Sequence, residues 1–252
     1  MKFSPIKTSH VISDKYKRYL STIFQISDKD YESQFEKALS EKEILSKGPY
    51  LDAVDAFKKG KSLFELINEG IVSKNMEKLN FPMDRPLYLH QEQAICKVQD
   101  KKNIVVSTGT GSGKTESFLL PVLSELSEEL EKGILCPGVR ALLIYPMNAL
   151  ANDQVERLRE LLDEYPEITY GSYTGQTQQK EVDALRDYKN LNKGKTPKKN
   201  EFISREVMLK TPPHILITNY AMLEYLMVRP SESVFFKGKY ANCIVDFAKK
   251  LH

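Results

Sequence analysis

The sequence predicts an α/β fold in which helices cover both faces of a parallel sheet, preceded by a helical N-terminal segment. Beyond about residue 83, short apolar runs alternate with amphipathic helices, which is typical of a parallel sheet covered on both faces. From Asp28 to Ser73, apolar residues instead recur near every 3.6 positions, which indicates several short helices. We therefore expect a helical segment over residues 1–83 and an α/β domain over residues 84–252.

Within the α/β domain, each predicted element has its own pattern. The turn residues around Asn80–Pro82 and Arg85–Pro86 mark its start. Residues 176–200 are rich in Gln, Lys and Asn, and we interpret them as a helix followed by a mobile basic loop. We expect this loop to be solvated; the alternative is that its lysines contact nucleic-acid phosphates. The predicted strands cover residues 103–107, 139–145, 168–172 and 214–218, and the predicted helices begin at Lys114 and Asn148.

Composition excludes some classes of protein and leaves others open. Apolar residues make up 41% of the chain, and no apolar run approaches the roughly 20 residues needed to cross a bilayer. The three cysteines lie far apart without paired spacing, so we expect a reduced, cytoplasmic setting and no membrane. The net charge of +3 neither requires nor forbids a nucleic-acid partner. Any basic groove must therefore come from local placement of charge.

The strongest motif is STGTGSGKT at residues 107–115, between a predicted strand and a predicted helix. Glycines allow successive backbone N–H groups to turn inward around phosphates, and the positive end of the helix adds to that attraction. Lys114 is expected to reach the β- and γ-phosphates, and the Thr115 hydroxyl to complete a Mg²⁺ shell. The usual pattern has Gly where this chain has Thr108. The residues expected to hold the nucleotide here are Thr108, Gly109, Thr110, Gly111, Ser112, Gly113, Lys114 and Thr115.

Gln91 lies 23 residues before Lys114, at the start of a helical pattern. Its amide offers a donor and an acceptor together, which suits the edge of an adenine base. Alone, it reads more simply as an exposed helix residue.

Three further segments place small polar residues where a predicted strand ends. Such ends, and the helix N-termini that follow, offer backbone N–H groups to a nucleic-acid phosphate without reading its sequence. Each segment alone is an ordinary strand-to-helix turn, but their order along the chain is informative. The expected contacts with a nucleic-acid strand are Pro146, Asn148, Ala149, Thr174, Gly175, Thr218 and Asn219.

Together these motifs resemble those of superfamily 2 DEAD/DEAH-box helicases, within a bacterial group that carries a C-terminal domain of unassigned function and is linked to DNA repair and phage defence. The likeness extends to about Tyr240 and includes Gly48–Leu51, Arg85–Tyr88 and Asn219–Pro230. It implies a RecA-like P-loop fold, the cofactors ATP and Mg²⁺, and a nucleic-acid partner, DNA rather than RNA. It also implies a second RecA-like domain, or a partner supplying it, which closes on the first when ATP binds.

The resemblance breaks near the end of the chain. In the family, a strand there ends in Asp-Glu-Ala-His, in which Asp holds Mg²⁺ and Glu activates the attacking water. This chain has Asp246 followed by Phe247. Asp246 can stand in for the magnesium-binding Asp, but a phenyl ring cannot accept a proton.

The leading hypothesis is therefore the ATP-binding and strand-binding part of an ATP-dependent DNA helicase or translocase. One alternative is a catalytically silent remnant that holds nucleotide or single strand, or a fragment of a phage-defence helicase subunit. Another is a P-loop kinase or transport ATPase, which leaves the segments 141–154 and 213–223 unexplained.

We predict that this chain alone binds ATP weakly and hydrolyses it negligibly. The residue after Asp246 is no general base, and the second RecA-like domain with its arginine finger is not part of this sequence. An arginine finger alone raises the rate of nucleotide hydrolysis by about 10³ to 10⁵. The measurement is phosphate release with and without single-stranded DNA, and DNA-stimulated turnover would contradict the prediction.

Overall fold

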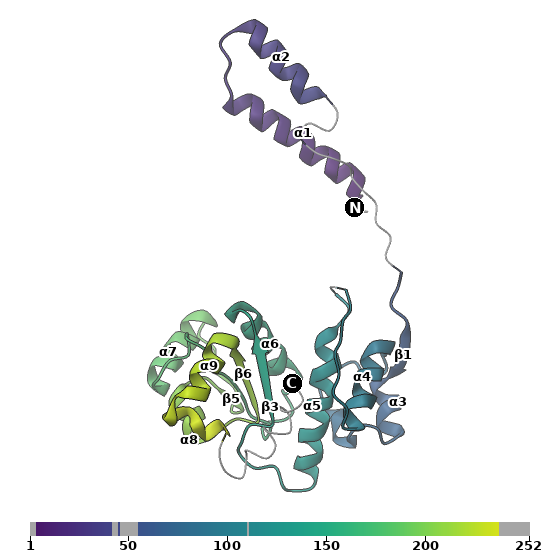
Figure 1. The fold of residues 1–252 in the computed structure, drawn as a ribbon, viewed down its shortest axis with the longest axis vertical. Helices are drawn as coiled ribbons and strands as arrows, with labels where there is room; N and C mark the ends of the chain where they lie inside the picture. Colours follow the sequence, from purple (N-terminus) through teal and green to yellow (C-terminus); the bar gives the residue numbers. More distant parts are fainter. Residues whose placement is uncertain (1–3, 42–44, 46–54, 110, 237–252) are drawn as a thin grey trace. The chain divides into compact units, whose positions relative to one another are not determined.

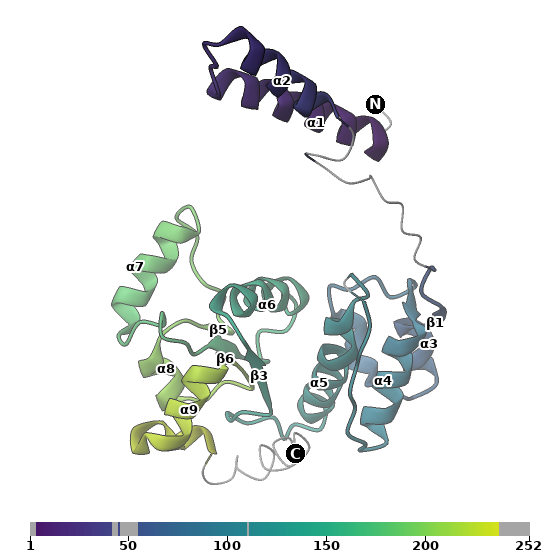
Figure 2. The ribbon, with the colours of Figure 1, turned by 45° about the horizontal axis from the view of Figure 1, so that its top comes forward.

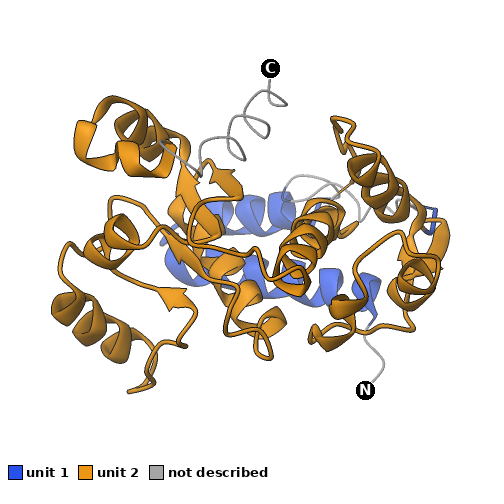
Figure 3. Cartoon of the chain, turned by 90° about the horizontal axis from the view of Figure 1, so that it is seen from below, with its two compact units in different colours: residues 1–56 blue, residues 57–252 orange. Residues whose placement is uncertain are grey.

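The computed structural model describes residues 4–41, 45, 55–109 and 111–236. The chain divides into two compact units, Met1–Ala56 and Phe57–His252 (Figure 3). None of the helices in these described ranges is both long and apolar enough to span a bilayer.

The first unit contains two helices, α1 (Pro5–Ile23) and α2 (Lys29–Ser40). Helix α1 begins with Pro5, whose fixed φ suits a first helical turn. Asp28 caps α2, because its Oδ1 accepts from the backbone N–H groups of Asp30 at 2.9 Å and Tyr31 at 3.2 Å. The sequence predicted helices from Asp28 onward, and α2 agrees with that prediction. Helix α1 lies before the predicted helical region.

The second unit opens with a small antiparallel sheet and three short helices. Strand β1 (Lys59–Ser62) pairs with β2 (Pro86–Tyr88), and α3 (Leu63–Asn68), the 3₁₀ helix η1 (Lys74–Lys78) and α4 (Leu89–Gln99) accompany them. Ser62 ends β1 and caps α3 in a reciprocal pair with Glu65. The purely helical expectation for residues 28–73 is wrong at β1. Pairing with a segment more than twenty residues further on, rather than local periodicity, decides that strand.

The main sheet has four parallel strands in the order β3-β6-β4-β5, which confirms the predicted α/β class. Figures 1 and 2 show helices on both sides of it. The strands are β3 (Ala141–Tyr145), β4 (Tyr170–Ser172), β5 (Glu201–Phe202) and β6 (Ile215–Asn219). The remaining elements are α5 (Lys114–Glu131), α6 (Asn148–Leu161), α7 (Glu181–Leu191), α8 (Arg205–Lys210), α9 (Tyr220–Val228) and the 3₁₀ helix η2 (Pro230–Phe236).

Alternate side chains of β3 and β6 enter two different apolar clusters. Ala141, Leu143, Ile215 and Ile217 join the larger cluster, which α5 and α6 cover. Leu216 lies on the opposite face, where the cluster includes α8, α9 and η2. A strand buried on both faces is expected in a parallel sheet, and it explains the continuous apolar run ILI in β6.

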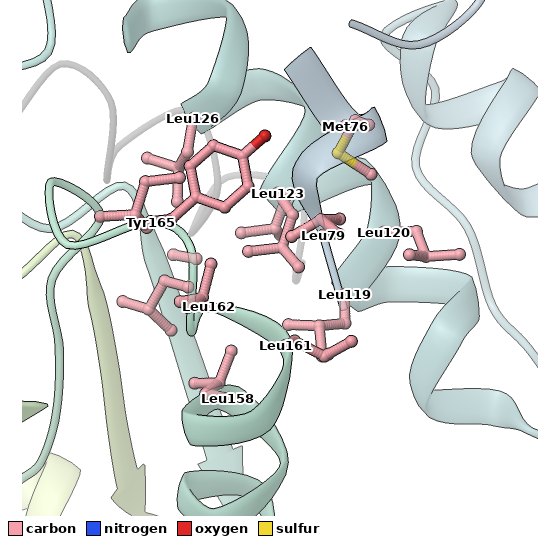
Figure 4. Packing of buried hydrophobic residues seen from close by; sticks show 14 of the residues in the cluster. Met76, Leu79, Leu119, Leu120, Leu123, Leu126, Leu158, Leu161, Leu162 and Tyr165 are labelled. Atoms are coloured by element: carbon pink, nitrogen blue, oxygen red, sulfur yellow. The ribbon is translucent and has the colours of Figure 1, made fainter. Parts of the chain in front are cut away.

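Helix α5 joins the two halves of the second unit. It lies between α4 and the sheet in both ribbon views (Figures 1 and 2). Figure 4 shows its leucines Leu119, Leu120, Leu123 and Leu126 meeting Met76 and Leu79 from one direction and Leu158, Leu161, Leu162 and Tyr165 from the other. Residues 57–83 therefore share one core with the sheet. The compact unit begins at Phe57, earlier than the junction that the sequence placed near residue 83.

One predicted strand is absent. Residues 103–107 form no strand, and no described strand pairs with them. Val105 in their middle is 96% exposed. The physical reason is that an extended segment becomes a strand only when a neighbour takes up its backbone N–H and C=O groups. The correction leaves the phosphate-loop motif between an extended segment and a helix.

The segment 176–200 contains the predicted helix, α7. The basic loop that follows is held at its C-terminal end by contacts of Lys198 and Asn200. Lys198 forms an ion pair with Asp163. Asn200 is buried, and its Nδ2 donates to the carbonyl oxygens of Leu162, Tyr165 and Ile168, the nearest at 2.9 Å. Strand β5, which follows directly, escaped the sequence pattern because two residues carry no periodicity.

His214 couples the stability of the fold to pH. Its Nδ1 accepts from the Thr169 N–H at 2.9 Å, and its Nε2 lies 3.2 Å from the Cys136 carbonyl oxygen. Burial, with the nearby Arg140 charge, lowers the pKa of the imidazole to about 4.

We predict that the free energy of unfolding falls between pH 6.5 and pH 4 because of His214. Above pH 6.5 the imidazole is neutral in both states. Below it, the unfolded chain takes up a proton that the folded chain excludes until about pH 4. The loss approaches about 3 kcal/mol. Urea unfolding at each pH should show a flatter profile for His214→Gln, since carboxylate titrations are common to both proteins. Parallel profiles would refute the role of His214.

Candidate nucleotide and strand-binding site

The phosphate-loop motif forms a turn that leads into α5. Gly113 is the N-cap of α5 in the left-handed conformation, with φ of 69°, and Gly111 has φ of 75°. Both values favour glycine. Gly113 is also required for space, because an added Cβ would lie 2.4 Å from Gln91 Nε2. Around Gly109 and Gly111 an added Cβ would meet nothing within 4 Å, so this side of the turn is open. Thr110 lies outside the described residues.

Lys114 and Thr115 lie at the start of α5, beside the glycine turn. Lys114 Nζ folds back over the turn and donates to the Gly109 carbonyl at 2.8 Å. Thr108 and Ser112 hydroxyls are 2.6 Å apart and close the base of the turn. Thr115 is half-buried in the first turn of α5. The Lys114 ammonium therefore lies at the N-terminus of α5, where a helix favours an anion such as a phosphate.

Gln91 connects α4 to the turn. Its Oε1 accepts from the Tyr88 N–H at 2.8 Å, and its Nε2 donates to the Gly113 carbonyl at 2.8 Å. The side chain is buried, with one N–H and one lone pair left for a ligand. The sequence pattern alone suggested an exposed helix residue. The structure shows instead that Gln91 is buried and holds the Gly113 end of the turn.

An aromatic group beside Gln91 was not identified from the sequence. His90 Nε2 lies 3.0 Å from the Ser112 carbonyl oxygen. The His90 ring centroid is 5.8 Å from that of Tyr88 and 5.8 Å from that of Phe57. The sequence signal for this group was His90, directly before Gln91. Its partner Phe57 lies more than thirty residues earlier, so the sequence alone did not connect them.

Glu116 was also missed, although it follows Thr115 directly. It is buried, and its Oε1 accepts from Arg157 of α6. Its Oε2 lies 3.0 Å from the position of an added Cβ at Gly113, and no described residue donates to it. A cavity of about 590 Å³ adjoins the pair, lined in part by Phe81, Arg85 and Gln154. The Glu116–Arg157 ion pair therefore joins α5 to α6, the helix that follows β3.

The expected strand-binding residues gather at one edge of the sheet, because β3, β6 and β4 are neighbouring parallel strands. Tyr145 and Asn219 are register partners, and Asn219 Nδ2 donates to Asn148 Oδ1 at 2.7 Å. The same Asn219 caps α9 through Met222 N–H at 2.7 Å. Within the described part of the chain, no side chain caps α6, so no described side chain accepts from its first N–H groups. Pro146, Ala149 and Gly175 are exposed at this edge.

Thr174 and Thr218 lie beneath that edge. Thr218 is buried, and its hydroxyl donates to the Tyr173 carbonyl at 2.7 Å. Thr174 is buried too, and its Oγ1 accepts from the Gln176 N–H at 3.3 Å. Both threonines therefore shape the turns that carry the exposed positions. Asp246 lies outside the described residues.

A glycine turn with a lysine at the start of a helix, packed on a parallel α/β sheet, is typical of a P-loop domain, and its structural neighbours are RecA-like helicases. The family model for DEAD/DEAH box helicases matches residues 88–246. The chain belongs to the DEAD/DEAH box helicase family. This family belongs to superfamily 2, as the sequence motifs of this chain indicate.

The relatives are much longer than this chain. Druantia protein DruE from Escherichia coli (strain UMEA 4076-1) is 28% identical across 90% of the chain and 17% of its own length. ATP-dependent helicase Lhr-Core from Methanothermobacter thermautotrophicus is 36% identical across 56% of the chain and 15% of its own length. The crystal structure of the DUF1998 helicase MrfA bound to DNA and AMPPNP matches with 26% identity and a TM-score of 0.50, covering 72% of this chain and 21% of that one.

We predict that Arg157→Ala lowers the free energy of unfolding by about 1 to 3 kcal/mol, because it leaves the buried Glu116 carboxylate without its cation. The partial exposure of Arg157 limits the loss. The double variant Glu116→Gln with Arg157→Ala should recover part of it, since a neutral amide costs less to bury. Chemical denaturation is the measurement. Lys132→Ala, which breaks an exposed pair in the same helix region, serves as control and should change little.

Proposed function

We propose that this chain is the ATP-binding and strand-binding part of an ATP-dependent nucleic-acid helicase. The observation that supports it most directly is the turn at Gly111–Gly113, which leads into the N-terminus of α5 and beside which Lys114 Nζ donates to the Gly109 carbonyl. Backbone N–H groups of this turn hold the phosphates, Lys114 neutralises their charge, and Thr115 completes the Mg²⁺ shell. The bound magnesium supplies charge neutralisation of the phosphates.

ATP is the nucleotide that fits the surroundings of the turn. Gln91 retains one N–H and one lone pair, the pattern that an adenine edge complements. The MrfA structure with AMPPNP supports an adenine nucleotide, since it contains an ATP analogue in a related fold.

Single-stranded nucleic acid is the proposed partner for the sheet edge. The open N-terminus of α6 and the exposed turn at Gly175 offer backbone donors along a line of strand ends. Asn219 and Asn148 fix the first two of these strand ends to each other. The MrfA structure contains DNA, which supports DNA over RNA for this chain.

Unwinding needs more than this part of the molecule. The chain spans between 15% and 21% of these relatives, so we propose that a second RecA-like domain closes over the nucleotide in the whole protein. Phe247 after Asp246 favours a second candidate, a catalytically silent chain that binds nucleotide and strand without hydrolysis. Both candidates share the two binding sites.

We predict that Lys114→Ala weakens nucleotide binding at least about tenfold, because it removes the ammonium that lies beside the glycine turn. Titration of a fluorescent ATP analogue into the 252-residue chain, with and without single-stranded DNA, is the measurement. Lys132→Ala is the matched control, since Lys132 lies at the C-cap of the same helix. Equal affinities for Lys114→Ala and the wild-type chain would overturn the nucleotide site.

A further inference from the structure

The turn at residues 173–177 is held by side chains that no sequence motif predicted. Tyr173 is fully buried, and its N–H donates to the Ile217 carbonyl at 2.8 Å. Its hydroxyl donates to Glu232 Oε1 at 2.8 Å, and Phe235 packs edge-on against its ring at 5.3 Å. Glu232 belongs to η2, nearly sixty residues further along the chain, and is itself buried. A buried ring with a fixed hydroxyl is thereby anchored under the turn.

Arg205 lies on this ring and binds the turn above it. Its Cζ is 5.1 Å from the centroid of the Tyr173 ring. Its Nε donates to the Thr177 carbonyl at 3.0 Å, and a terminal nitrogen donates to the Thr174 carbonyl at 2.9 Å. Two carbonyls of one turn are therefore directed at a single planar guanidinium, which a lysine ammonium cannot reproduce.

The direction of the Thr174 carbonyl determines the direction of the next amide. In a trans peptide, the C=O of one residue and the N–H of the following residue point in opposite directions. Because the Thr174 C=O points toward Arg205, the Gly175 N–H points away from it. Gly175 is exposed, an added Cβ there would meet nothing within 4 Å, and no described group accepts from its N–H. The amide is thus free to donate outward at the strand-binding edge.

We propose that Arg205 and Glu232 are positioning residues for strand binding, which together turn the Gly175 N–H toward a phosphate of the bound nucleic acid. Glu232 fixes the Tyr173 ring, the ring supports the guanidinium, and the guanidinium orients the peptide. Neither Arg205 nor Glu232 touches the strand. The inference rests on the proposed strand-binding function and adds the residues that shape it.

The test compares Arg205→Lys with the wild-type chain for binding of a fluorescent single-stranded oligonucleotide over a range of salt concentrations. One backbone hydrogen bond lost predicts about 3- to 10-fold weaker binding. The slope of log affinity against log salt should stay unchanged, because a neutral amide releases no counterion. Binding of the ATP analogue should also stay unchanged.

Two further variants guard against a change in folding. Glu232→Gln keeps an oxygen that can accept from the Tyr173 hydroxyl and should bind nearly as wild type, whereas Glu232→Ala should weaken binding like Arg205→Lys.

The possible outcomes separate the inference from the function beneath it. Unchanged oligonucleotide affinity in both Arg205→Lys and Glu232→Ala overturns the positioning role. A changed salt slope in Arg205→Gln, which removes the cation, also overturns it, since the change would mean that Arg205 meets a phosphate itself. If the wild-type chain binds no oligonucleotide while Lys114 still governs nucleotide binding, the strand-binding function fails and the inference fails with it.

Discussion

The packing of α5 into a single apolar core is the constraint on which the rest of the second unit depends. Its leucines contact η1 and α4 on one side and the sheet with α6 on the other. Residues at 0 to 2% exposure on a helix between two layers leave no freedom to rotate it. The glycine turn leads directly into the N-terminus of that helix. The core therefore fixes the positions of Lys114 and Thr115 in its first turn. The proposed nucleotide site is therefore pre-organised by the packing of α5.

The polar links around the turn extend this constraint outward. Gln91 ties α4 to Gly113, and Glu116 ties the first turn of α5 to Arg157 of α6. Helix α6 begins at the strand-binding edge, where Asn219 and Asn148 connect the ends of β6 and β3. Nucleotide site and sheet edge are therefore joined through two helices and a small number of hydrogen bonds.

Corrections to the sequence-based expectations share one cause. Residues 103–107 carry a strand pattern, yet Val105 is exposed because no described strand pairs with the segment. Residues 59–62 lie in a helical pattern and become β1 because β2 pairs with them. Residues 57–83 were assigned to a separate segment and share the core of α5. In each case a distant neighbour decided the outcome, and local periodicity contains no information about that neighbour.

The amino-acid sequence by itself determined the class of fold, the positions of α5, α6, β3 and β6, and the motif at residues 107–115. It did so because glycine spacing, helix starts and apolar periods are local properties of a chain. Only the tertiary structure decided that Gln91 orients the turn, that Arg157 neutralises Glu116, and that Glu232 and Arg205 hold the turn at Thr174–Gly175. These pairs are separated by 22 to 59 residues. Burial leaves each polar group in need of a partner, and the packed fold decides which partner is within reach.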